Sequence, residues 1–447
     1  MDIQELKQIM QENGIIGAGG AGFPTYGKLD SRVDTVILNC AECEPLLKVH
    51  RQLLASHAHE IVEALGEVAE AVEAKEIIIA VKKAYTETIA EVEQAFKEIS
   101  LEVPIRIGFL PEVYPAGDEV ITIYETTGKI VPPGKIPLEV GVAVFNVETM
   151  YNIYRAVFWK QPVTYKYLTI AGEVQEPKTV KVPIGMRIRE VLELAGGVTT
   201  KHPAYVHGGP MTGNLVEDTE LITKTSNAVL VFDESHLVVQ KKRGRDSINM
   251  KRAMASCCQC QMCTDLCPRH LLGHPIEPHA FMRAATTGVT KDLKPFLDTY
   301  YCSQCGLCEM YSCNQNLSPR TLIGNYKNGL RKQGVPPLAE PKLSKVNSLR
   351  EQRLVPMRRL IARLGLTKYD IPAPLCETEV KSSRVAIRIN QHIGAPAITL
   401  VHPHDLVIKN QRIAKADGTK LSIYYHAPFN GHVLEVTDTY VIIQADN

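Results

Sequence analysis

Eight cysteines near the middle of this 447-residue chain constrain its structure more than any other feature. They form two runs with nearly the same spacing, Cys257, Cys260, Cys263 and Cys267, then Cys302, Cys305, Cys308 and Cys313. Two-residue gaps in a turning loop bring three sulfurs around one corner of a cubane cluster, and a fourth thiolate arrives from elsewhere. The spacing therefore predicts two [4Fe–4S] clusters in a helical, ferredoxin-like domain.

The division of these ligands between the two clusters follows from two-cluster ferredoxins, where the fourth cysteine of each run serves the other cluster. One cluster then takes Cys257, Cys260, Cys263 and Cys313, and the other takes Cys302, Cys305, Cys308 and Cys267. Cys258 is interpreted as a bystander, although a shift of ligation by one residue stays open. A zinc ribbon is the alternative, but it needs four ligands in two pairs and no third cysteine in each run.

Composition excludes several other classes of function. The net charge of +1 gives no reason to expect nucleic-acid or anionic-membrane binding. No apolar run approaches the roughly 20 residues that span a bilayer, and residues 1–14 are too charged for a secretory signal. We therefore expect a cytoplasmic protein, where its twelve cysteines are metal ligands or redox groups rather than disulfides.

The first third of the chain alternates between strand and helix patterns. A short amphipathic helix around Leu6 and Met10 precedes a glycine-rich stretch at 14–24. Buried-strand patterns follow at 35–39, 76–81 and 140–146, with helical stretches between them. This alternation predicts a Rossmann-like α/β domain over residues 1–160, with a parallel sheet covered by helices.

Four further segments complete a multidomain α/β chain. Residues 163–235 indicate a small α+β module, and 247–335 enclose the cysteines. Residues 336–380 are basic: 320–368 holds 12 Lys/Arg against 2 Asp/Glu. This composition favours a solvated linker over a docking patch. The strand-rich tail, 381–447, predicts a compact all-β module.

The glycine-rich stretch and the ends of the predicted strands suggest a ligand site. Glycines let backbone N–H groups approach a phosphate, although a tight turn explains the pattern equally well. Polar residues follow the strands at 39–44, 117–119 and 146–149, where open α/β sheets bind ligands. Cys40 and Cys43 flank Glu42, whose charge raises a thiol pKa, so we interpret them as buried structural cysteines rather than a redox dithiol.

The motifs GAGGAGFPTYGKL, NCAECEP, YPAGDE and FNVETM resemble the flavin subunit of respiratory complex I, and still more the C subunit of Rnf-type complexes. The resemblance implies bound FMN with NADH docking against it. The implied flavin contacts are Gly17, Gly19, Gly20, Lys28, Asn39, Glu42, Gly117, Asp118, Glu119, Asn146 and Thr149. Phe23 and Glu44 are the implied NADH contacts. Complex I subunits have arginine in place of Ala18 and aspartate in place of Ala41.

The other modules extend this resemblance over nearly the whole chain. GEVQEPKTVKVPIG resembles the β-grasp module called SLBB, and the tail resembles the barrel-sandwich domain that opens Rnf-type C subunits. This domain order, with CTDLCPRHLLGHPIEPH and the four-residue gap before Cys313, resembles the cobalamin reductases of propanediol-utilising bacterial microcompartments. That family implies shell proteins as further partners. Residues 1–14 then form either a shell-targeting helix or one packed on the flavin domain.

Three functions are compatible with these features. The first is an NADH-dependent oxidoreductase in which FMN takes a hydride and releases electrons singly through two clusters to a corrinoid, from cob(III)alamin to cob(II)alamin. A corrinoid adenosyltransferase is the implied partner. The second is an Rnf-like electron-input subunit that delivers electrons to another protein. The third is a cluster-bearing scaffold with a vestigial flavin site. None needs a catalytic side chain, because the cofactors carry the chemistry.

Overall fold

The structure is a computed structural model that describes residues 1–288 and 291–446. Its N-terminal domain is built on a parallel sheet in the order β3–β2–β1–β5. The strands are β1 (Thr35–Cys40), β2 (Glu76–Lys82), β3 (Ile105–Leu110) and β5 (Val142–Asn146). β1 and β2 are almost continuously apolar because helices cover both faces of the sheet.

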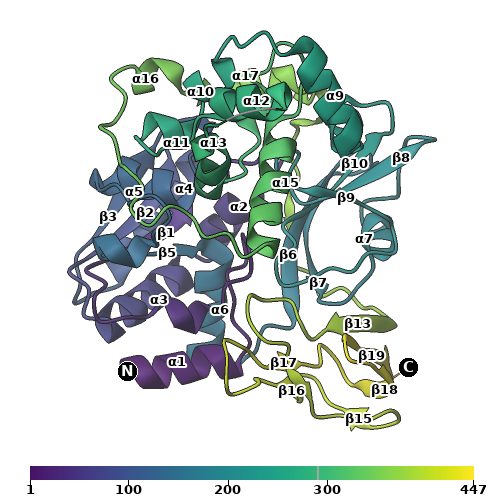
Figure 1. The fold of residues 1–447 in the computed structure, drawn as a ribbon. Helices are drawn as coiled ribbons and strands as arrows, with labels where there is room; N and C mark the ends of the chain where they lie inside the picture. The colour runs from purple at the N-terminus through teal and green to yellow at the C-terminus, as the bar shows by residue number, and fades with distance from the viewer. Residues whose placement is uncertain (289–290, 447) are drawn as a thin grey trace.

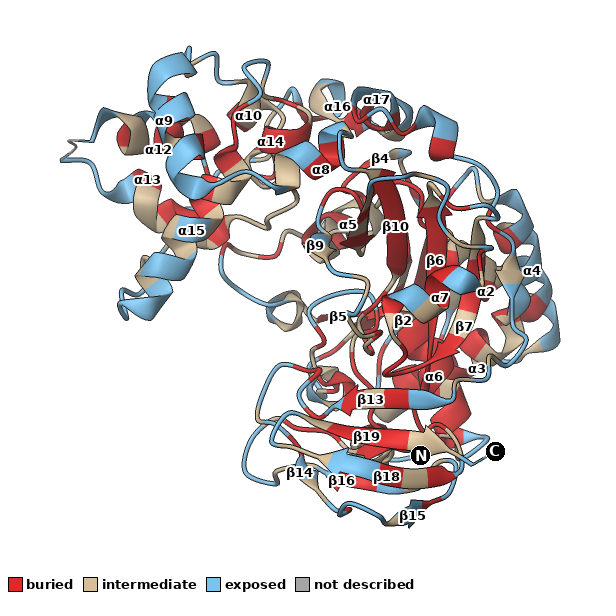
Figure 2. Ribbon diagram, turned by 90° about the vertical axis from the view of Figure 1, so that its right-hand side faces the viewer, coloured by how far each residue is buried: buried red, intermediate tan, exposed pale blue. Residues whose placement is uncertain are grey.

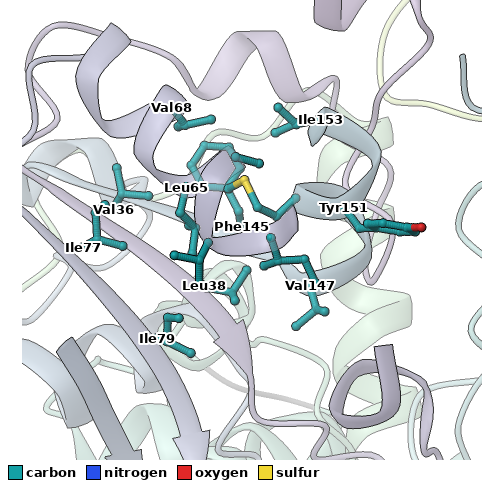
Figure 3. Close-up of a cluster of buried hydrophobic side chains, with 14 of the residues drawn as sticks. Val36, Leu38, Leu65, Val68, Ile77, Ile79, Phe145, Val147, Tyr151 and Ile153 are labelled. Atoms are coloured by element: carbon teal, nitrogen blue, oxygen red, sulfur yellow. The ribbon is translucent and has the colours of Figure 1, made fainter. Parts of the chain in front are cut away.

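Helices on the two faces form separate cores. α1 (Ile3–Glu12), α2 (Val49–Ser56), α3 (Ala58–Ala71), α4 (Thr86–Glu98) and α6 (Val147–Val157) cover one face, and α5 (Glu119–Thr127) covers the other. Figure 3 shows Leu65 of α3 and Ile153 of α6 meeting the first face. Leu6 and Met10 of α1 are fully buried in this core. α1 is therefore a helix packed on the flavin domain, the second of the two alternatives for residues 1–14.

The β-grasp module has a six-stranded sheet in the order β12–β7–β6–β10–β8–β9. Its own elements are β6 (Tyr165–Gly172), β7 (Lys178–Pro183), α7 (Ile188–Glu193), β8 (Pro203–His207), β9 (Asn214–Val216) and β10 (Ala228–Asp233). The short helix α8 (Leu237–Lys242) follows and leads toward the cysteines.

The cysteine-bearing domain is helical, as predicted. Its helices are α9 (Asp246–Ser256), α10 (Met262–Asp265), α11 (Pro268–Leu271), α12 (Pro278–Thr287), α13 (Lys294–Leu297), α14 (Leu307–Met310) and α15 (Pro319–Lys332). Phe281, Leu322 and Ile323 form its small apolar core. A core of this size leaves much of the domain's cohesion to whatever the cysteines bind.

The segment expected to be a solvated linker is mostly exposed over 336–349, but from residue 350 onward it is packed on two domains. It holds α16 (Arg350–Arg353), β11 (Val355–Pro356), α17 (Met357–Arg363) and β12 (Leu375–Cys376). β11 pairs with β4 (Val113–Tyr114) of the flavin domain, and β12 extends the β-grasp sheet beside β7. Arg350 is only 3% exposed because its guanidinium pairs with Glu125 and lies 4.8 Å from the Tyr124 ring. We call residues 336–380 the return segment.

The C-terminal module is a barrel of two sheets, ordered β13–β19–β18–β15 and β14–β16–β17. Its strands are β13 (Arg384–Arg388), β14 (Ile398–Thr399), β15 (Leu406–Val407), β16 (Arg412–Lys415), β17 (Tyr425–His426), β18 (Gly431–Val436) and β19 (Tyr440–Ala445). Figures 1 and 2 place it beside α1, at the opposite end of the molecule from the cysteine domain. Among the described residues, no helix is long and apolar enough to cross a membrane.

Candidate functional site

A pocket of about 430 Å³ lies at the carboxyl ends of β1 and β5. It is lined by most of the residues predicted to contact flavin, namely Gly17, Gly19, Gly20, Lys28, Asn39, Gly117, Glu119, Asn146 and Thr149. Phe23, a predicted NADH contact, lines it as well. The pocket therefore brings together residues from four separate sequence motifs.

The glycine loop reaches the pocket through a backbone arrangement that excludes side chains. The amide of Gly17 donates to the Phe23 carbonyl at 2.9 Å, and that of Ala18 donates to Thr149 Oγ1 at 2.9 Å. A Cβ on Gly19 would lie 2.4 Å from Asn146 Nδ2. A side chain at residue 19 would have to displace Asn146, so glycine lets the loop lie close to the start of α6.

Polar side chains of the pocket are fixed by the protein itself. Lys28 Nζ donates to Glu119 Oε1 at 2.9 Å and to the Val144 carbonyl at 2.7 Å. Asn146 caps α6 by accepting from the Glu148 amide at 2.9 Å, and its Nδ2 lies 3.0 Å from His50 Nε2. Burial and, secondarily, Lys166 lower the pKa of His50 to about 3, so His50 is neutral and accepts this bond.

Three predicted contacts lie outside the pocket. Glu42 is buried, with its pKa raised by burial, and accepts from the His50 amide at 2.8 Å. Glu44 is bound by the β-grasp module, through the amides of Met211 at 2.9 Å and Thr212 at 2.8 Å. Asp118 caps α5 beside the pocket. These carboxylates therefore accept hydrogen bonds from the protein backbone around the pocket and do not line it.

The two cysteines at the end of β1 are not reactive thiolates. Burial, followed by the charge of Glu42, raises the pKa of Cys40 well above its ordinary value. Burial and then Glu44 raise the pKa of Cys43 to about 12. Both thiols stay protonated at neutral pH, which agrees with a structural role.

The pocket's chemistry fits FMN. Its lining includes the glycine-loop backbone, Lys28 and two asparagines, which suit a phosphate and a hydroxylated chain. It also includes Ile136, Leu138 and Phe145, which are able to face a flat ring. Ala18 and Ala41 are buried, and neither lines the pocket.

The two cysteine loops share one backbone conformation. Gln259 and Gln261 have φ of 55° and 65°, and Gln304 and Gly306, at the matching positions, have 60° and 84°. Left-handed backbone is costly for a non-glycine residue, so its recurrence at equivalent positions marks a functional loop. In each loop a glutamine amide donates to the first cysteine sulfur, at 3.2 Å and 3.3 Å.

The structure brings the predicted cysteine ligands together in two neighbourhoods. Cys257, Cys260, Cys263 and Cys313 line one cavity. Burial and then the neighbouring Cys313, Cys257 and Cys260 raise the pKa of Cys263 to about 12. Burial and then Cys267 raise the pKa of Cys305. Grouped thiols of this kind become thiolates when iron binds them, so the donor set fits two cubane clusters.

The cysteines fit a shifted ligand set or a single metal ion less well than they fit two cubane clusters. Cys258 is exposed and lines the first cavity as well, whereas Cys257 is less exposed and acts electrostatically on Cys263. Among residues 1–288 and 291–446, no three acidic, histidine or cysteine side chains converge closely enough to hold one metal ion. A cubane spaces its four sulfurs on four separate irons, so it does not need such convergence.

One cysteine group is joined directly to the flavin pocket. Arg269, two residues after Cys267, forms a bidentate pair with Asp118, in which Nη2 donates to Oδ1 at 2.8 Å and Nε donates to Oδ2 at 3.3 Å. Tyr114 Oη donates to the Cys305 carbonyl at 2.6 Å. We call Cys267, Cys302, Cys305 and Cys308 the flavin-side set, and Cys257, Cys260, Cys263 and Cys313 the outer set.

Family comparisons agree with this architecture. Successive stretches match the Nuo51 FMN-binding domain over 10–155, the SLBB domain over 167–215, the 4Fe-4S dicluster domain over 256–318 and the RnfC barrel sandwich hybrid domain over 373–446. The predicted fold class is confirmed, and so are FMN and two [4Fe–4S] clusters as its cofactors.

Several proteins are similar over long stretches. The cobalamin reductase PduS of Citrobacter freundii is 39% identical over 99% of this chain and 97% of its own length, and that of Salmonella typhimurium is 38% identical over the same shares. The C subunit of the Na⁺-translocating ferredoxin:NAD⁺ oxidoreductase complex of Acetobacterium woodii is 32% identical over 61% of this chain and 59% of its own length. The chain therefore belongs to the PduS family of cobalamin reductases.

Proposed function

We propose that this protein is an NADH-dependent reductase that passes electrons singly from FMN through two [4Fe–4S] clusters to a corrinoid, taking cob(III)alamin to cob(II)alamin. Bound FMN supplies the exchange between a two-electron hydride donor and one-electron acceptors. The protein positions and tunes these groups. Lys28, Asn39, Asn146 and the glycine loop hold the flavin, and Phe23 faces NADH.

The observation that carries this proposal is the bridge between Asp118 and Arg269. Asp118 lies between two pocket residues, Gly117 and Glu119, and Arg269 belongs to the loop of the flavin-side cysteines. Their side chains are only 11% and 17% exposed. A half-buried bidentate pair fixes both partners, so the flavin and its nearest cluster are held in one geometry.

The order of electron transfer follows from the same bridge. The flavin-side set is next to the pocket, so its cluster receives electrons first. The outer set, with Cys260 exposed, receives them second and faces the acceptor. We further propose a corrinoid adenosyltransferase as the user of the product and a microcompartment as the location; the support for both is the family resemblance alone, since Leu6 and Met10 of α1 are packed in the flavin-domain core.

Stopped-flow absorbance of the anaerobic holoprotein tests the proposal. NADH should bleach flavin first and then the clusters, and cob(III)alamin should restore the cluster colour. In Arg269→Gln, flavin bleaching should keep its rate while cluster bleaching slows. Arg353→Gln breaks a different ion pair, with Asp265 at 3.1 Å, and is the control. Equal cluster bleaching in both variants would remove the bridge as the basis of the proposal.

A further inference from the structure

A second cavity lies beside the outer cysteine set. It measures about 270 Å³ and is bounded by α8, α14 and α17, which come from three different parts of the chain. Cys313 forms part of its wall, with Lys241, Glu309 and Arg363. We call it the Cys313 cavity. It is separate from the flavin pocket and shares no lining residue with it.

The polar groups of the Cys313 cavity favour an anion. Lys241 Nζ donates to the carbonyls of Asn316 at 2.9 Å and Leu317 at 3.1 Å, which leaves one N–H without a protein acceptor among the described residues. Arg363 is exposed, and it forms no ion pair with any residue in 1–288 or 291–446. The cavity therefore has two cations with unused donors.

The one carboxylate in the cavity is already engaged. Glu309 accepts from the Thr321 amide at 2.9 Å and from its hydroxyl at 3.0 Å, and the residue is 5% exposed. Arg252 of α9 also acts electrostatically on Lys241, which adds a third positive charge nearby. Two lining cations and this neighbour outnumber the two negative groups of the cavity, the hydrogen-bonded Glu309 carboxylate and the Cys313 thiolate that holds iron, so the cavity attracts a further negatively charged group.

Size and position identify the group. The cavity is smaller than the roughly 300–1,000 Å³ of pockets that enclose a whole drug-sized ligand, so it holds one anionic part of a larger molecule. Its wall contains a thiol of the outer set, from which electrons leave the protein. The bound group should therefore belong to the electron acceptor.

We propose that the Cys313 cavity binds the phosphodiester of the corrinoid nucleotide through Lys241 and Arg363, and thereby docks the acceptor against the outer cluster. This rests on the proposed function. One electron leaves the reduced cluster and converts Co(III) to Co(II), with no proton transfer. A planar guanidinium and a lysine are suited to phosphate oxygens.

Equilibrium dialysis of the oxidised holoprotein tests this inference, with cobalamin and with cobinamide, which keeps the corrin ring but lacks the nucleotide phosphodiester. The wild type should bind cobalamin more tightly. Arg363→Gln should weaken cobalamin binding roughly tenfold, the scale of one charged hydrogen bond, and leave cobinamide binding unchanged. Arg358→Gln, on the same helix but outside the cavity, is the control and should bind both as the wild type does.

Two further results separate the possible failures. If the wild type binds both corrinoids equally, or Arg363→Gln binds cobalamin normally, the phosphodiester site is refuted while the proposed function stands. If neither corrinoid binds, the proposed function is refuted as well. The cluster's EPR spectrum should be the same in Arg363→Gln; a changed spectrum with unchanged binding would show that the cations only offset cluster charge and would overturn the inference.

Discussion

The buried ion pair between Glu148 and Lys166 joins the flavin domain to the β-grasp module. Glu148 is in the first turn of α6, Lys166 is in β6, and each side chain is 1% exposed. Glu148 also accepts from the Tyr167 amide at 3.1 Å, and Lys166 donates to Asn227 Oδ1 at 3.2 Å. Burial raises the pKa of Glu148 and lowers that of Lys166, which shows how strongly the site disfavours an unpaired charge.

Replacing one partner should be more harmful than replacing both. Glu148→Gln keeps the shape but leaves a buried ammonium, which costs about 3–5 kcal/mol of unfolding free energy. Lys166→Met should cost a similar amount because it leaves a buried carboxylate. The double variant should recover most of either loss, because two neutral groups need no counterion. In Glu148→Gln the unfolded chain binds more protons than the folded one as Lys166 loses its proton, so its deficit should shrink as pH rises.

Urea unfolding measured by tryptophan fluorescence is the assay. The chain's single tryptophan, Trp159, follows α6 and lies 5.2 Å from the Tyr154 ring, so it reports this region. Glu176→Gln, from the exposed pair with Lys178 at 3.1 Å, is the control and should cost less than about 1 kcal/mol. A double variant less stable than both single ones would refute the reasoning.

Three other predictions address the cofactors and pH. Cys257→Ser should lower iron from about eight to about four atoms per chain, whereas Cys258→Ser should leave it unchanged, as measured by iron analysis. Gly19→Ala should lower flavin affinity at least about tenfold in fluorescence titrations, because its Cβ would displace Asn146. Burial lowers the pKa of His57, but the hydrogen bonds and charges of two glutamates raise it by more than burial lowers it. The net pKa of His57 is therefore above 6.5. Its stabilisation is therefore complete below pH 6.5 and lost as pH rises through the raised pKa, and His57→Gln should remove this dependence in urea titrations.

Each of these predictions has a clear contrary outcome. Loss of iron in Cys258→Ser instead of Cys257→Ser would move the ligand by one residue. Gly20→Ala, whose Cβ meets no protein atom within 4 Å, is the matched loop variant. If it lost more flavin than Gly19→Ala, direct flavin contact would matter more than the Asn146 geometry. An unchanged pH dependence in His57→Gln would assign that dependence to other groups.

Short sequence patterns predicted the features of this protein that depend on neighbouring residues, such as the buried strands and the cysteine loops. β1 contains the apolar run Val-Ile-Leu and β2 the run Ile-Ile-Ile-Ala-Val, which are typical of a strand covered on both faces. The cysteine spacing determined the loops, because two-residue gaps have few conformations that gather sulfurs. The glycine pattern alone left a tight turn equally possible, and the structure shows why Gly19 is small: a Cβ there would lie 2.4 Å from Asn146 Nδ2.

Contacts between distant segments could not be predicted in this way. His50 is an isolated histidine in the sequence, yet it supports Asn146 from a position 96 residues away. Glu44 accepts hydrogen bonds from Met211 and Thr212, which are 167 and 168 positions later in the chain. The motif around Glu44 therefore could not predict this contact. The high charge content of the return segment predicted a solvated linker. It outweighed the signal of Leu360, Leu364 and Leu366, which are fully buried in the structure. In each case the partner is set by tertiary packing.

The docking of the barrel on the N-terminal elements bears on how such proteins are rearranged. Arg412 pairs with Glu12 at 2.6 Å, the Tyr424 amide donates to Gln11, and the Ile393 amide donates to Gly22. These contacts depend on proximity in space and are indifferent to which segment is synthesised first. A barrel encoded before the flavin domain can occupy the same position as one encoded after the clusters. Shuffling this module between the two ends of a gene therefore preserves the interface that encloses the glycine loop.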